Sequence, residues 1–292
     1  MDPDELTKCF VSWTTALSDL AGGDLVAIDG KTLRQSFDRA TSQSAIHMVS
    51  AWATANRLVL GQVKVDDKSN EITAIPKLLK TLDLSGATVT IDAMGCQKEI
   101  AQVITEQGAD YVVALKTNHS TLYDDVKLFL DDAQASGFAA LDYAYHETVD
   151  GEHGRIETRR YWTTSEIDWL GAKMSWANLQ SIGFVESQRA IGDKVELERR
   201  YYIVSFRADG ARFGDAVWQH WGVENGLHWG LDVSFDEDAC RIRKDKGAQT
   251  FSVLCHIALN MLKREGQNKR GIKARRKRSG WDRNYLLQVL MA

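Results

Sequence analysis

Cysteine pairs, prolines and long apolar runs are all scarce in this sequence of 292 residues, and each scarcity excludes a class of protein. The four cysteines form no CxxC pair, which argues against a zinc ribbon or a redox motif, and free thiols are typical of a reducing cytoplasm. Only two prolines occur, so a proline-rich linker is not expected. No apolar run approaches the roughly 18 residues of a membrane-spanning helix. The acidic residues 1–5 do not resemble a signal peptide.

Charge is distributed unevenly along the chain. The net charge is −4, but residues 241–292 hold fourteen Lys and Arg against three acids. The first 240 residues hold 22 basic and 37 acidic residues. This asymmetry predicts an acidic body with a basic arm that contacts phosphates. A solvated helix with a ragged C-terminus explains the charge equally well.

Hydrophobic periodicity predicts an α/β fold in the first half of the chain. A helix over residues 2–20 ends at Gly22-Gly23, and a strand over residues 25–28 then runs into Asp29. The remaining pattern predicts a β-hairpin followed by alternating helices and strands, a mixed sheet with helices against it. These elements are expected at residues 46–54, 57–65, 69–82, 87–91, 98–107, 111–115 and 121–135.

The second half changes character after Gly137. Residues 143–164 and 183–206 predict two long hairpins, with turns at residues 151–154 and at Gly192-Asp193. Helical periodicity returns over residues 215–231 and 250–263. We therefore expect five parts: an N-terminal helix (1–22), a first core part (23–136), a β-rich insertion (137–210), a second core part (211–262) and a basic arm (263–292).

Two acidic residues stand at the ends of apolar strands. Asp29 follows residues 25–28, and Asp92 follows residues 87–91. A carboxylate there is costly to bury unless it is paired or holds a cation. If the two strands are neighbours, the carboxylates could bind a hard cation such as Mg²⁺. The alternative is that each caps a turn, at Asp29-Gly30 and at residues 92–95.

A predicted helix carries His220, Glu224 and His228 at successive four-residue steps, so the three should share one face. A zinc site is an alternative interpretation, although the HExxH arrangement is absent. The acidic triplet at residues 236–238 lies beside Arg241, Arg243 and Lys244 and could be surface charge. The densest basic cluster is typical of a phosphate-binding surface, or of a solvated tail. Its members include Lys273, Arg275, Arg276, Lys277 and Arg278.

Four motifs together resemble the ISAs1 family of bacterial insertion-sequence transposases, which includes the H-repeat-associated proteins. They are AIDGKTLR at residues 27–34, TIDAMGCQ at 90–97, GRIETRR at 154–160 and HWGVEN at 220–225. The resemblance covers residues 2–290, and the ordered set is far more specific than any one motif. Family members carry a further N-terminal helical region, so this chain is expected to be a shorter form.

The resemblance implies an RNase H-like core related to IS4-type transposases, with a catalytic triad of Asp29, Asp92 and Glu224. The triad would hold two Mg²⁺ (or Mn²⁺) ions for phosphoryl transfer. Of the IS4-type signature Y-x2-R-x3-E-x6-K only Glu224 matches, so the DNA contacts are expected from Arg241, Arg243 and Lys244 and from the basic arm. The implied partners are double-stranded DNA at the element's ends and at the target. A homodimer on those ends, in the bacterial cytoplasm at the nucleoid, is also implied.

Three functions follow from this resemblance. The first is a DDE transposase that cuts and rejoins insertion-sequence ends. The second is a shortened, catalytically silent DNA-binding remnant, and the third is a metal-dependent nuclease without strand transfer. Strand transfer from a pre-cut end separates the first from the other two.

Overall fold

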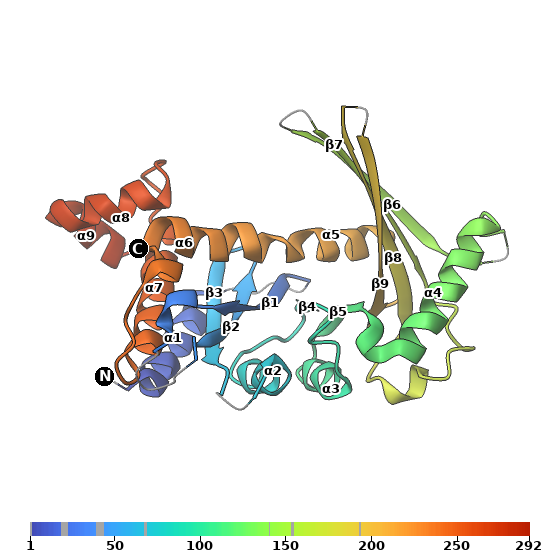
Figure 1. Cartoon of the computed structure of the whole chain (residues 1–292), viewed down its shortest axis with the longest axis horizontal. Coiled ribbons are helices and arrows are strands. Elements are labelled where there is room, and N and C mark those ends of the chain that lie inside the picture. The colour runs from blue at the N-terminus through green and yellow to red at the C-terminus, as the bar shows by residue number, and fades with distance from the viewer. Residues whose placement is uncertain are drawn as a thin grey trace. The chain divides into compact units, whose positions relative to one another are not determined.

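A computed structural model describes residues 2–18, 23–38, 44–66, 69–139, 141–152, 155–192 and 194–292. The chain forms two compact units (Figure 1). The first unit comprises Met1–Asp83 and Trp221–Ala292, and the second comprises Leu84–His220.

The first unit is built on a three-stranded antiparallel sheet in the order β3-β2-β1, with helices packed against it. Val26, Ala27 and Trp52 are almost fully buried in its core. The Asn260 side chain donates to and accepts from the backbone of Val59 at 2.8 and 3.0 Å, which fixes α7 against β3. The elements are α1 (Pro3–Leu17), β1 (Leu25–Thr32), β2 (His47–Ala53), β3 (Leu58–Lys64), α2 (Glu71–Leu79), η4 (Glu224–His228), α6 (Trp229–Phe235), α7 (Gly247–Arg264), α8 (Ile272–Trp281) and α9 (Arg283–Leu290).

The second unit contains a six-stranded mixed sheet in the order β4-β5-β9-β8-β7-β6. Strands β4 and β5 are parallel, and the other pairs are antiparallel. The four longest strands form the twisted arm seen in Figure 1. The elements are β4 (Thr88–Ile91), α3 (Lys98–Glu106), β5 (Asp110–Leu115), α4 (Ser120–Ala135), β6 (Ala144–Glu152), β7 (Arg155–Thr164), β8 (Ser181–Ile191), β9 (Lys194–Val204) and α5 (Gly210–His220).

Paired residues of neighbouring strands in the arm face the same side, so each face can be followed from strand to strand. Near its base, Trp162 stacks on Phe184 with ring centroids 4.6 Å apart. One step outward on the same face, Arg160 and Arg199 pair with Glu186 and hold the central strands together. This register explains why the sequence in this region is rich in both aromatic residues and arginine.

The α/β class and the mixed sheet predicted from the sequence are confirmed, and so is the element order through α4. Both predicted hairpins are present, although residues 153, 154 and 193 of their turns lie outside the described residues, as does Gly22. The predicted helix over residues 215–231 is wrong in its limits. It is replaced by α5, a π turn and α6. Among the described residues, no helix is long and apolar enough to span a membrane.

Candidate active site

Asp29 lies inside β1, which continues to Thr32, so the Asp29-Gly30 turn is not formed. The carboxylate accepts a hydrogen bond from the Gly30 amide at Oδ1, at 2.9 Å. Its other oxygen, Oδ2, lies 3.0 Å from Nε2 of His228. With 21% of the side chain exposed, Asp29 is held on both oxygens and still reaches the surface.

The two residues that follow Asp29, Gly30 and Lys31, each have a structural role. A Cβ added to Gly30 would meet the ends of the His47 and Glu71 side chains, which bond to each other, so a larger residue would require that pair to move. Lys31 is on the same face of β1 as Asp29, but it forms ion pairs with Asp232 and Glu237 instead. Glu237 is only 1% exposed, so the acidic triplet is not simply surface charge. The ion pairs of Lys31 fix the strand just after Asp29.

Asp92 directly follows β4, as the sequence predicts. Its Oδ1 accepts hydrogen bonds from the amides of Met94 and Gly95 at 3.0 and 3.2 Å, so the turn-capping interpretation is confirmed. Capping uses one oxygen of this carboxylate, so it does not exclude a role as a metal ligand. The loop is further fixed by Asn118 and His119, which bond to its backbone carbonyls at 2.8 and 2.6 Å.

Glu224 begins a single π turn, η4 (Glu224–His228). Such a turn inserts an extra residue per turn and is frequent at functional sites. Glu224 is exposed, whereas His228 is buried with 6% exposure. The two side chains of this pair therefore differ in their surroundings, one facing solvent and the other the interior. His220 belongs to α5, and its Nδ1 lies 2.9 Å from Oγ1 of Thr90.

Among the described residues, no group of three His, Cys, Asp or Glu side chains is arranged to hold a metal ion, so the zinc interpretation gains no support. Asp29 and Glu224 belong to the first unit and Asp92 to the second, so the convergence of the triad stays a prediction. The chemistry of the donors fits magnesium, since all three supply carboxylate oxygens. No lysine or arginine is paired with Asp29 in the part of the chain that the structure describes.

One of the residues predicted to bind DNA has a structural role instead. Arg275 is buried with 7% exposure, and its guanidinium pairs with Glu265 at 2.9 Å. It also lies 3.2 Å from the hydroxyl of Tyr285 in α9. The assignment of Arg275 to a phosphate contact is therefore wrong for this structure. The basic arm is folded into α8 and α9, so it is not a ragged tail.

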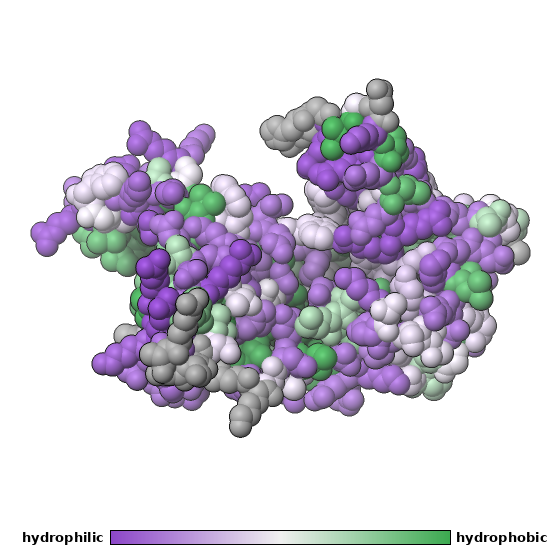
Figure 2. Space-filling view, viewed as in Figure 1, coloured by the Kyte–Doolittle hydropathy of each residue, from purple (hydrophilic) through white to green (hydrophobic). Residues whose placement is uncertain are grey.

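The other basic candidates lie closer to solvent. Arg243 packs over Phe37 and donates to the carbonyl of Gln35 at 3.1 Å, and Arg278 pairs with Asp282. Arg276 is half-buried over the Phe235 ring. Hydrophilic side chains of α8 border apolar ones of α9 on the surface in Figure 2. The exposed members are Arg241, Lys244, Lys273, Lys277 and Arg278.

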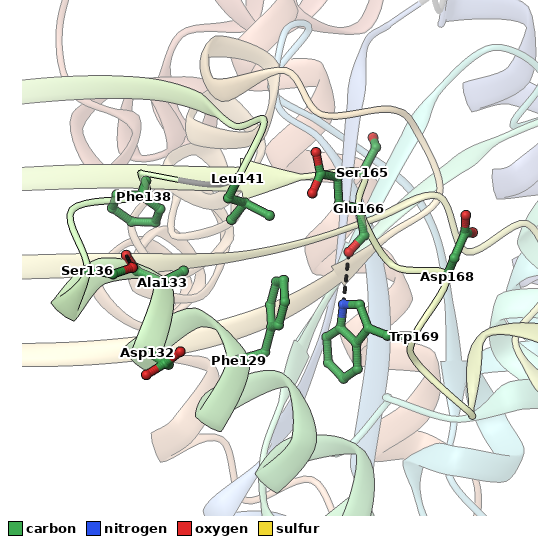
Figure 3. A pocket seen from close by; sticks show the side chains of 10 residues that line it. All are labelled: Phe129, Asp132, Ala133, Ser136, Phe138, Leu141, Ser165, Glu166, Asp168 and Trp169. Atoms are coloured by element: carbon green, nitrogen blue, oxygen red, sulfur yellow. Dashed lines mark hydrogen bonds between the residues drawn. The ribbon is translucent and has the colours of Figure 1, made fainter.

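An open pocket of about 520 Å³ lies in the second unit between α4 and residues 165–169 (Figure 3). Phe129 stacks on Trp169, whose indole nitrogen donates to the carbonyl of Glu166. The lining includes Asp132, Glu166 and Asp168 and none of the predicted site residues. Acidic walls repel phosphates, so this pocket does not suit a DNA backbone.

With this geometry in place, comparison with known proteins identifies the class. The pattern of the family described as "Transposase DDE domain" matches residues 20–261, so the chain belongs to this family. It is 39% identical over 295 aligned positions to "H repeat-associated putative transposase YhhI" of Escherichia coli (strain K12). That alignment covers 99% of this chain and 77% of the relative. YbfL of the same strain gives the same identity and coverage.

A solved structure shares the fold. The chain superposes on a piggyBac transposase from a synaptic complex with hairpin DNA, with a TM-score of 0.51 and 12% identity. The superposition covers 97% of this chain and 57% of that one. At this identity the likeness concerns the fold alone.

Proposed function

We propose that this chain is a DDE transposase of the ISAs1 group that cleaves insertion-sequence ends and joins them to target DNA. The observation that carries the proposal is the position of three acidic residues inside the region that matches the transposase DDE domain, residues 20–261. Asp29 and Asp92 lie in or directly after sheet strands, and Glu224 begins a π turn. The relatives named as transposases support the same class.

In this proposal Asp29, Asp92 and Glu224 hold two Mg²⁺ ions. When bound, these ions would activate water or a 3′-hydroxyl and stabilise the leaving 3′-oxygen. The chain's own contribution is to orient its carboxylates. The Gly30 amide and His228 hold Asp29, and the amides of Met94 and Gly95 hold Asp92. Glu224 is exposed at the start of its turn, where it can meet a ligand without costly desolvation.

Double-stranded DNA is the proposed substrate, both at the element's ends and at the target, and we propose a homodimer on paired ends. Basic side chains near the C-terminus would neutralise backbone phosphates. They are Arg241, Arg243, Lys244, Lys273, Arg276, Lys277 and Arg278. The proposed location is the bacterial cytoplasm, at the nucleoid.

A strand-transfer assay tests this function. Purified chain is incubated with Mg²⁺, a labelled pre-cut end of the insertion sequence that carries its gene, and a supercoiled target plasmid. We expect joined product from the wild type and none from Glu224→Gln, while DNA affinity changes by no more than a few-fold. Metal-dependent nicking without joining would identify a nuclease instead. Binding without either reaction would identify a silent remnant.

A further inference from the structure

A polar contact between the π turn and β1 joins His228 to Asp29. Nε2 of His228 lies 3.0 Å from Oδ2 of Asp29, and only 8% of the histidine side chain is exposed. An ionised carboxylate only accepts hydrogen bonds, so Nε2 must carry the proton and donate it. From this geometry we propose that His228 is the positioning residue of Asp29. This inference rests on the proposed function, because it takes Asp29 as a metal ligand.

Packing alone does not explain a histidine at this position. Its other ring nitrogen, Nδ1, is buried and has no hydrogen-bond partner among the described residues. Burying an unpartnered polar atom costs free energy, which leucine or phenylalanine would avoid. The neighbouring Leu227 and Leu231 are fully buried and already supply the apolar packing of this face. The contact with Asp29 is therefore what the imidazole contributes.

The π turn that carries the buried His228 is itself held in place. The ammonium group of Lys263 donates to the carbonyl of Gly226, in the middle of the turn, at 2.7 Å. The same group lies 4.0 Å from the centre of the Trp52 ring. A Cβ added to Gly226 would lie 2.9 Å from that ring, so only glycine fits. A turn fixed from both sides gives His228 a defined position.

The two hydrogen bonds to Asp29 fix its carboxylate and leave lone pairs on both oxygens. One oxygen accepts from the Gly30 amide and the other from His228, which fixes the rotation of the carboxylate. Each oxygen keeps a further lone pair for a metal ion. Partners of this kind orient carboxylate ligands, and their loss typically costs about 10- to 100-fold in metal affinity or activity. The same π turn carries Glu224 and holds Asp29 through His228, so it bears on two of the three proposed ligands.

The test measures Mn²⁺ affinity of the full chain by the electron paramagnetic resonance signal of the free ion. His228→Gln places an amide nitrogen near the position of Nε2, whereas His228→Asn reaches only as far as Nδ1. We expect affinity to fall about 10- to 100-fold in His228→Asn and in His228→Phe. In His228→Gln we expect it within about threefold of the wild type. Thermal unfolding of each variant checks that it is folded.

The outcomes separate this inference from the proposed function. If Asp29→Asn loses Mn²⁺ while all three His228 variants bind it normally, the positioning role is overturned and the proposed function stands. Equal loss in the Gln and Asn variants would also overturn the role, because rescue requires the hydrogen bond. If Asp29→Asn itself binds Mn²⁺ as the wild type does, the proposed metal site fails. Should His228→Phe not fold, the Gln and Asn variants still decide.

Discussion

The guanidinium of Arg275 and the carboxylate of Glu265 form a buried ion pair 2.9 Å apart, with side-chain exposures of 9% and 4%. Glu265 follows α7 and Arg275 lies in α8. Tyr285 of α9 donates to the same carboxylate at 2.8 Å. This one cluster ties the last three helices together, so a residue within a basic run acts as a structural anchor.

Replacing Arg275 with Ala should destabilise the protein by about 3–5 kcal/mol, because it leaves the Glu265 charge buried without its partner. Denaturant unfolding of the full chain measures this change. Lys273→Ala, on the same helix but exposed, is the matched control and should change stability by less than about 0.5 kcal/mol. Equal stability of the two variants would contradict the anchoring role.

The remaining basic residues of α8 should set the salt dependence of DNA binding. Neutralising Lys273, Arg276, Lys277 and Arg278 together removes up to four phosphate contacts. Each contact contributes about 0.9 to the slope of log affinity against log salt. We therefore expect the slope to flatten by up to about 3.6 on duplex DNA, with sequence preference little changed. Binding titrations at several salt concentrations measure it.

A control with the same change in charge separates local contacts from the net charge of the protein. Lys8, Lys77, Lys80 and Lys194 are exposed and lie on other elements. Neutralising these four should leave the slope nearly unchanged. If both quadruple variants flatten it equally, the effect is one of overall charge and α8 is not the binding surface.

Because Lys263 is largely buried, we expect the free energy of unfolding to depend on pH. Burial, with the nearby charge of Arg57 as a smaller cause, lowers the pKa of Lys263 to about 7. In the unfolded chain the pKa of lysine is near 10.4, so above pH 7 the unfolded state binds more protons. The free energy of unfolding should therefore gain a contribution that grows from pH 7 towards pH 10.

Lys263→Met removes this titration and gives the test. Between pH 7 and 9, the wild type should gain more unfolding free energy than Lys263→Met, as measured by denaturant unfolding at each pH. Parallel pH profiles for the two proteins would show that Lys263 keeps its ordinary pKa in the folded state.

The sequence predicts the elements well because their signals are local. Alternating and three- to four-residue apolar periods locate β1 to α4, and turn residues locate both hairpins. The π turn is not visible in this way, because the i, i+4 spacing of Glu224 and His228 fits an ordinary helix. Its signal is indirect: Gly226 is a poor helix former, and in the structure it contacts Trp52.

The candidate site is only partly predictable for the same reason. Asp29 and Asp92 are found from their positions after apolar strands. Asp29, Lys31 and Arg275 bond to residues elsewhere in the sequence, up to about two hundred positions away. No local pattern encodes such pairs. The sequence alone therefore groups Arg275 with its basic neighbours, although its side chain is buried.

The central claim is that Asp29, Asp92 and Glu224 are ligands of the same metal pair, and a metal-rescue experiment tests it most directly. Asp29→Cys, Asp92→Cys and Glu224→Cys replace oxygen with the softer sulfur, which disfavours Mg²⁺ more than Mn²⁺. Asp215→Cys, at an exposed position on α5, is the control.

Strand transfer from a pre-cut end is then measured for all four variants in each metal. The account predicts that the first three variants are inactive in Mg²⁺ and regain part of their activity in Mn²⁺. The control should behave as the wild type in both metals. Wild-type activity in Mg²⁺ for any one of the three would contradict the claim.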